Sequence, residues 1–310
     1  MKKEITVTAP ATVANVACGF DILGFAIDLP EDQIKATLSR KKGVRLVALT
    51  GKKTGIPKIA LKNTAAVAVQ ALLNDVAPDK GIDLKLHKGI APGSGVGSSA
   101  ASSAAALVAA NELLGRPFTR SQLVPYAMQG EAIACGTAHA DNVAPCLIGG
   151  FVLVRDYAPL DIISLHVPKN LHCVVIHPKI KLNTSDSRSI LKRNVSLEKA
   201  IRQWANTAGL VAGLFKEDYK LIGSSLVDNV IEPLRAGLIP GFSEVKEAAM
   251  EAGALGCSIS GSGPSSFALC ASLNEGKKVA AAMQKCMKGI GLKNDVFISK
   301  INKTGAKVKK

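Results

Sequence analysis

The stretch GIAPGSGVGSSAASSAAALVAANELLG, residues 89–115, carries the clearest chemical signal in the chain. Its three closely spaced glycines let the backbone approach a ligand, and Ser98 and Ser99 follow where a helix is expected to begin. The free amides and the positive dipole end of such a helix attract phosphate oxygens, and two hydroxyls there can donate to a phosphate or ligate Mg²⁺. An ordinary serine cap without a ligand explains the same residues, so this stretch alone leaves both interpretations open.

Two well-known phosphate motifs do not fit this stretch. A Walker-type loop needs a lysine after its last glycine, whereas Gly97 is followed by two serines. The segment from Gly95 to Ala100 matches G-x-G-x-x-A, but a proline separates it from the preceding strand, and Arg120 stands where a dinucleotide site needs an acid. A loop without lysine must obtain its positive charge from Mg²⁺ and the helix start.

Three further segments place polar side chains among unusually small residues. They are PATVANVACGFDILG at 10–24, with Asn15 and Asp21, EAIACGTAHADNVAPCLIGG at 131–150, with Glu131, His139, Asp141 and Asn142, and SISGSGPSSFAL at 258–269, a second glycine-rich turn. Turn chemistry or helix capping explains each segment separately. Their occurrence together with the serine loop favours one shared site.

The hydrophobic pattern predicts the elements that position these segments. Residues 4–16 and 82–90 alternate as half-buried strands do, and residues 63–77 between them have helical spacing with Asn63 or Thr64 as the cap. The alanine-rich helix, a second helix near 119–136 and a strand at 149–157 follow. From about residue 160 the pattern predicts strand, strand, helix, helix, hairpin, helix and strand.

These elements predict an α+β protein with helices on one side of a sheet. We expect two domains, residues 1–160 and 161–302, because 310 residues exceed one typical core. The lysine-rich tail, residues 303–310, is expected to fray because it offers little to bury.

Composition narrows the classes of partner. The net charge of +15 would suit a polyanion, but aromatic residues are only 4% and the lysines are dispersed, so nucleic acid is not expected as a partner. Neither a membrane-spanning stretch nor a secretory signal is recognisable, which predicts a cytoplasmic protein away from membranes. The seven cysteines form no C-x-x-C pair and are expected to be reduced, small buried hydrophobes.

Together the quoted motifs resemble the kinase superfamily named for galactokinase, homoserine kinase, mevalonate kinase and phosphomevalonate kinase (GHMP kinases). PGSGVGSSAA is similar to the superfamily's phosphate loop, whereas PATVANVACGFDILG, HADNVAP and DNVIEPLRAGLIPGF are most similar to its homoserine branch. The resemblance extends from Pro10 to about Phe267. It implies an N-terminal domain folded like the second domain of a small-subunit ribosomal protein and a ferredoxin-like C-terminal domain.

The resemblance also implies ATP and Mg²⁺ as cofactors and homoserine as the substrate, whose hydroxyl is phosphorylated during threonine biosynthesis. We expect the enzyme to be a homodimer. The residues implied for ATP are Asn63, Pro92, Gly93, Ser94, Gly95, Val96, Gly97, Ser98 and Ser99. Ser99 and Glu131 would hold Mg²⁺. Asn15, Asp21, His139, Asp141, Arg188 and Arg235 would bind homoserine, the two arginines at its carboxylate, and Asp141 would act as a base only in second place.

Other functions stay open at this point. A sister kinase would act on mevalonate or another small alcohol and would not need both arginines together with a site for an ammonium group. A binding module without activity would be expected to lack Ser99 or Glu131, and both are present. A nucleic-acid-binding protein would bind heparin regardless of MgATP.

Overall fold

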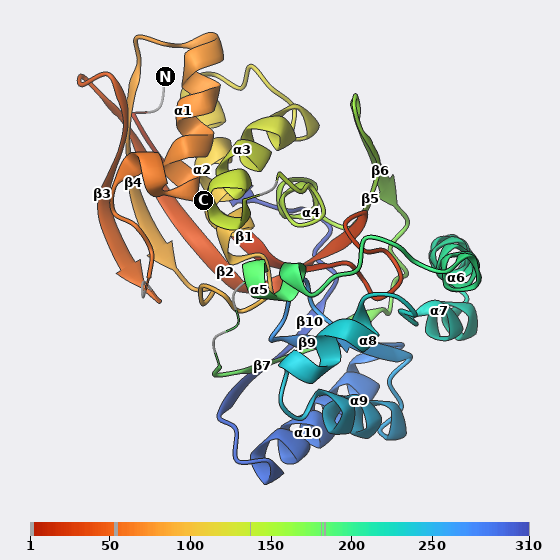
Figure 1. Ribbon diagram of the computed structural model, residues 1–310. Helices are drawn as coiled ribbons and strands as arrows, with labels where there is room; N and C mark the ends of the chain where they lie inside the picture. The colour runs from red at the N-terminus through yellow and green to blue at the C-terminus, as the bar shows by residue number, and fades with distance from the viewer. Residues whose placement is uncertain (1–2, 53–54, 137, 181, 183, 310) are drawn as a thin grey trace.

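The first of two β-sheets gathers strands from both ends of the chain (Figure 1). The computed structural model describes residues 3–52, 55–136, 138–180, 182 and 184–309. The strands of this sheet are β1 (Glu4–Ala14), β2 (Leu23–Ser39), β3 (Gly43–Gly51), β4 (Gly81–Lys88), β5 (Phe151–Tyr157), β6 (Leu160–Leu165) and β11 (Lys307–Val308). Their order is β11-β1-β2-β4-β3, with β5 joining β2 to β6. The β3–β4 pair is parallel and the other pairs are antiparallel.

The helices of the N-terminal half gather against this sheet, with α2 at their centre (Figure 1). They are α1 (Thr64–Val76), α2 (Ser98–Leu113), α3 (Val124–Cys135) and α4 (Val143–Ile148), with short 3₁₀ turns η1 (Ala60–Lys62) and η2 (Ser121–Leu123). Helix α2 contacts β1, β2, α1, α3 and α4. Its alanines and serines are nearly all buried, since small side chains allow this close approach on every side. That explains why the helix carries so little charge.

The second sheet has the order β10-β7-β9-β8 and is antiparallel throughout. Its strands are β7 (His172–Pro178), β8 (Gly256–Ile259), β9 (Ser266–Cys270) and β10 (Asn294–Lys300), and helices α9 (Phe242–Glu251) and α10 (Leu273–Gly289) pack on it. This strand order with two packed helices is the ferredoxin-like β-α-β-β-α-β arrangement. Between β7 and β8 the chain also forms α5 (Thr184–Ser189), α6 (Leu197–Lys216), α7 (Tyr219–Ser225), α8 (Glu232–Arg235) and η3 (Ala236–Leu238). The predicted α+β class is confirmed.

An aromatic trio joins the two sheets. The ring of Phe25 on β2 lies 4.6 Å from that of Phe151 on β5 and 5.9 Å from that of Phe267 on β9. All three side chains are fully buried. The contact places the starts of β2 and β9, and the loops that precede them, at the same junction.

The C-terminal tail corrects one prediction. Instead of fraying, it adds β11 to the first sheet, with Val308 opposite Val7, and Lys309 N donates to Thr6 O at 2.8 Å. The tail alternates instead, with buried Ala306 and half-buried Val308 between exposed Lys307 and Lys309. The chain passes from the first sheet to the second between β6 and β7, a few residues after the expected division at residue 160.

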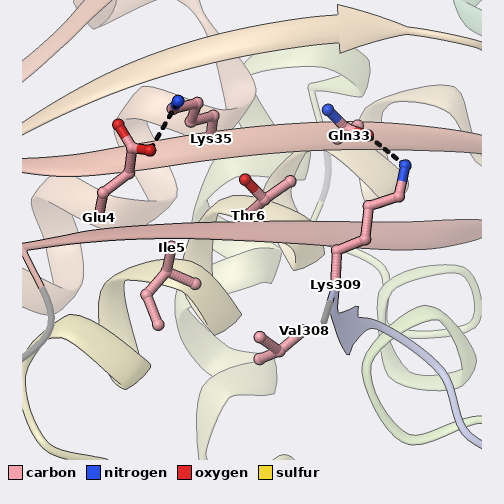
Figure 2. Close-up of a pocket in the computed structure, with 7 residues that line it drawn as sticks. All are labelled: Glu4, Ile5, Thr6, Gln33, Lys35, Val308 and Lys309. Carbon is pink, nitrogen blue, oxygen red and sulfur yellow. Dashed lines mark hydrogen bonds and ion pairs between the residues drawn. The ribbon is translucent and has the colours of Figure 1, made fainter.

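Figure 2 shows a hollow at the edge where β11 meets β1. Its charged side chains are paired, since Lys35 lies 2.6 Å from Glu4 and Lys309 donates to Gln33 at 3.1 Å. It includes none of the predicted site residues. Within the described parts of the chain, no helix has both the length and the apolar character to cross a bilayer.

Candidate active site

The phosphate loop adopts a conformation that requires its glycines. Gly93, Gly95 and Gly97 have φ values of +69°, +78° and +68°, in the left-handed region that side chains disfavour. A Cβ on Gly97 would lie 2.0 Å from Thr12 Oγ1, and one on Gly95 would lie 2.5 Å from Gly263 O. The loop is therefore packed between β1 and the second glycine-rich turn, and it ends at Gly97, the cap of α2.

The second glycine-rich turn fixes the orientation of the loop's peptide groups. Ser260 Oγ donates to Gly95 O at 2.7 Å, and Ser265 Oγ donates to Ser94 O at 2.5 Å. The carbonyl of a trans peptide points opposite to the amide of the next residue. The amides of Gly95 and Val96 consequently point away from the turn, which leaves them able to bind an anion.

The remaining residues predicted for ATP have different environments. Pro92 and Gly93 are exposed, Ser94 and Val96 are buried, and Ser99 lies partly exposed in the first turn of α2. The Ser98 hydroxyl donates to Ile90 O at 3.1 Å inside the loop, and its contact with ATP stays a prediction.

Asn63 has a structural role in the described chain. Its Oδ1 accepts from Ala66 N at 3.3 Å, which confirms the predicted cap of α1. Its Nδ2 donates to Pro57 O at 3.1 Å and so shapes the segment before the helix. A contact between Asn63 and a nucleotide base stays a prediction.

The loop after β1 holds Asn15 and Asp21 in a strained conformation. Asn15, Val16, Ala17 and Asp21 all have positive φ, and each such residue costs roughly 1–2 kcal/mol. Hydrogen bonds hold the loop in place: Asn15 Nδ2 donates to Gly261 O at 2.8 Å, and Asp21 N donates to Asn15 Oδ1 at 3.1 Å. The strain therefore occurs where predicted substrate ligands lie.

Arg188 and Arg235 reach this loop from the other half of the chain. Arg188 forms a bidentate pair with the Asp21 carboxylate, with N–O distances of 3.0–3.2 Å. Buried Arg235 donates to Ser187 O at 3.1 Å and to Gly261 O at 3.0 Å. Both guanidinium carbons lie over the Phe20 ring, 5.6 and 5.2 Å from its centre. Burial lowers the pKa of Arg235, and Arg188 lowers it further.

The acidic residues of the middle segment are buried beside this cluster. Burial, with the charges of Asp21 and Glu131, raises the pKa of Asp141 to about 7. Glu131 is itself buried on α3. His139 Nδ1 lies 3.8 Å from Asp21 Oδ2, and burial lowers the pKa of His139. A carboxyl group with a pKa near neutrality can bind a cation or accept a proton.

Four residues that contact the predicted substrate site were not predicted from the sequence. The Tyr157 hydroxyl donates to Asp21 O at 2.9 Å and accepts from Ala140 N at 3.2 Å, and the Phe20 ring lies under both arginines. Gln203 Nε2 and Thr207 Oγ1, on α6, each donate to Cys18 O at 3.0 Å. The ring of Phe20 next to Asp21 was a visible signal, whereas the two residues on α6 lie more than 180 positions from their partner.

The structure thus brings the predicted homoserine residues together. Contacts link Asp21 with Arg188 and His139, and Asn15 and Arg235 share Gly261 O. This group pairs carboxylates with guanidinium groups, which suits a ligand that carries both an ammonium and a carboxylate. Across the described residues no cluster of three His, Cys, Asp or Glu side chains forms a metal site. The hydroxyl and carboxylate oxygens of Ser99 and Glu131 are nevertheless the ligand type that Mg²⁺ prefers.

Comparison with known proteins agrees with this geometry. The model of the GHMP kinases N terminal domain matches residues 61–150, and that of the GHMP kinases C terminal matches residues 210–289. Homoserine kinase from Chlorobium phaeobacteroides (strain BS1) is 48% identical, with 99% of each chain covered. Homoserine kinase from Xanthomonas campestris pv. campestris (strain B100) is 39% identical, over 99% of this chain and 94% of that protein.

Solved structures give the same assignment. The crystal structure of homoserine kinase from Cytophaga hutchinsonii has a TM-score of 0.97 and 52% identity, covering 100% of this chain and 98% of that chain. Mevalonate kinase from L. major in complex with R-mevalonate has a TM-score of 0.73 at 18% identity, covering 97% and 98%, and shares the fold alone. On the strength of its full-length relatives, the chain belongs to the GHMP kinase superfamily and, within it, to the homoserine kinase family.

Proposed function

We propose that this protein transfers the γ-phosphoryl group of ATP to the side-chain hydroxyl of homoserine, forming O-phosphohomoserine on the route to threonine. The observation that carries the proposal is the pairing of Asp21 with Arg188 beside the phosphate loop, in a chain with homoserine kinase relatives at 48% identity over 99% of their length. Mevalonate kinases are similar only at the level of the fold.

The residues take distinct roles in this proposal. The amides of residues 93–99 and the start of α2 bind the phosphates of ATP, and Asn63 lies near its base. Arg188 and Arg235 bind the carboxylate of homoserine, while Asn15, Asp21, His139 and Asp141 bind its ammonium and hydroxyl groups. Because Asp141 has a pKa of about 7, it can also take the hydroxyl proton as the oxygen attacks phosphorus.

Ser99 and Glu131 would hold Mg²⁺, which would supply positive charge for the phosphates of ATP. Both side chains offer oxygen ligands, and α2 directs its N-terminal end toward the same loop. Ser99→Ala and Glu131→Gln should therefore weaken binding of Mn²⁺ as a probe ion, and should remove most turnover without unfolding the chain. Normal Mn²⁺ affinity in both variants would show that the metal ligands are elsewhere.

ADP release from MgATP, measured with homoserine, mevalonate, shikimate, serine and galactose, tests the substrate directly. We expect turnover with homoserine and little with the others. Mevalonate, shikimate and galactose lack an ammonium group for Asp21, and the hydroxyl of serine lies one methylene closer to its charged groups than that of homoserine. The proposal would be refuted if turnover occurred only with an alcohol other than homoserine.

A homodimer in the cytoplasm completes the proposal. Leu197, Ile201 and Trp204 form an exposed apolar stripe along α6, and such stripes usually mark interfaces. Light scattering should give the mass of a dimer for the wild type and of a monomer for Trp204→Glu, with Lys199→Glu on the same helix as the control. The cysteine side chains that the structure describes form no disulfide, as in a reducing compartment; the side chain of Cys135 lies outside the described part.

A further inference from the structure

A buried ionic cluster lies at the neck of the phosphate loop, apart from the residues given roles above. Lys88 ends β4, Asp32 lies on the neighbouring strand β2, and Ser102 lies in α2. Asp32 is 0% exposed and Lys88 is 2% exposed. Buried charges carry a large desolvation penalty, so such a pair persists only where its hydrogen bonds are well satisfied.

Each polar group of the cluster has its partners. The ammonium of Lys88 has three hydrogens and three acceptors: Asp32 Oδ2, Ser98 O at 2.7 Å and Ser102 Oγ at 2.9 Å. Ser102 Oγ in turn donates to Asp32 Oδ2 at 2.7 Å. The cluster is therefore a closed network whose geometry is set by all three side chains.

The same network holds both ends of the phosphate loop. Asp32 Oδ1 accepts from Gly89 N at 3.0 Å and Ile90 N at 3.1 Å, where the chain leaves β4. Lys88 donates to the carbonyl of Ser98, where α2 begins, and the Ser98 hydroxyl donates back to Ile90 O at the start of the loop. A loop whose first and last residues are tied to one buried cluster has little freedom to open.

We propose that Asp32, Lys88 and Ser102 are positioning residues for ATP: they close the neck of the phosphate loop and so hold its amides and Ser99 in the arrangement that binds phosphate. The inference rests on the proposed function, since it takes ATP as the ligand of the loop. The homoserine ligands Arg188 and Asp21 make no hydrogen bond to these three residues among the contacts described. The cluster should accordingly control ATP affinity and leave homoserine affinity unchanged.

Three variants separate positioning from general stability. Lys88→Met leaves the Asp32 charge buried without its counter-ion, which should lower the urea midpoint of unfolding. Asp32→Asn/Lys88→Met removes both charges but keeps an amide oxygen for Gly89 N and Ile90 N, so it should recover most of that midpoint. In both variants Ser98 O loses its bond from Lys88 and keeps the 3.4 Å contact with the Ser102 hydroxyl. Asp32→Asn alone isolates the effect of the acid.

The measurement is calorimetric binding of MgATP without homoserine, together with the KM for homoserine at saturating ATP. In the double variant we expect the ATP dissociation constant to rise at least about tenfold over the wild type. Loss of one hydrogen bond to a charged group has an effect of this size. The KM for homoserine should stay within about twofold of the wild type. ATP affinity equal to wild type, or an equal rise in both constants, would overturn the inference.

Two serines on α2 give a matched control should the double variant not fold. Ser102 belongs to the cluster, whereas the buried Ser103 hydroxyl makes no hydrogen bond to any residue that the structure describes. Ser102→Ala should weaken ATP binding severalfold and Ser103→Ala should not. Equal effects of the two variants on ATP affinity would reject the positioning role of the cluster. Absence of ATP binding in the wild type would instead refute the proposed function.

Discussion

Replacing Gly95 with alanine tests the packing of the phosphate loop against the second glycine-rich turn. The new Cβ would lie 2.5 Å from Gly263 O and 2.8 Å from Ser260 O, both backbone atoms that cannot rotate away. The turn would have to retreat by about 1 Å to regain van der Waals contact. That movement would break the bonds from the Ser260 and Ser265 hydroxyls to the loop.

The expected loss can be summed from these contacts. A left-handed conformation at a residue with a side chain costs roughly 1 kcal/mol, and each lost hydrogen bond costs about 1 kcal/mol. Gly95→Ala should therefore lose about 3 kcal/mol, divided between the free energy of unfolding and that of ATP binding. If it falls wholly on binding, the ATP dissociation constant rises roughly 100-fold.

Urea unfolding and calorimetric titration of MgATP measure the two parts. Gly289→Ala is the control, because a Cβ there meets no atom within 4 Å and helix α10 should gain about 0.5 kcal/mol. If Gly95→Ala keeps both free energies within about 0.5 kcal/mol of the wild type, the packing account is refuted.

Other predictions concern the substrate site and the tail. The pKa of Asp141 is raised above that of the unfolded chain, so its contribution to stability is complete below about pH 4 and is lost as the pH rises to about 7. Asp141→Asn should thus match the wild type near pH 4 and melt at a higher temperature at pH 8, with little turnover; parallel melting curves would contradict this. Arg188→Lys should raise the KM for homoserine at least about tenfold with an unchanged KM for ATP, because lysine cannot keep both bonds to a carboxylate; an equal rise in both would contradict it. Deleting residues 306–310 removes β11 and buried Ala306 and should lower the melting temperature by several degrees, whereas an unchanged melting temperature would indicate a frayed tail.

The loop's source of positive charge shows where the sequence was incomplete. The segment between Gly89 and Ser99 contains no lysine, which suggested Mg²⁺ and the helix start as its sources of positive charge. The structure places Lys88 behind the start of α2, paired with Asp32 from the neighbouring strand. Its position one residue before the loop was visible, but its burial depended on how β2 and β4 align.

The sequence by itself determined the local features of this protein. Glycine spacing predicted the phosphate loop, alternation predicted the strands at residues 4–16 and 82–90, and Asn63 or Thr64 was predicted as a helix cap. Turns, pleats and caps depend on neighbours a few residues apart. The motif resemblance added the family and the expected ligands. These predictions needed no knowledge of which segments meet.

Tertiary structure alone decided which distant groups touch. Asp21 pairs with Arg188 across 167 positions, Ser260 holds Gly95 across 165, and β11 joins β1 from the opposite end of the chain. Such contacts follow from strand order and register, which are set by the burial of whole faces rather than by any short pattern. The phosphate loop could be read from its own residues, but the surroundings that make it rigid could not.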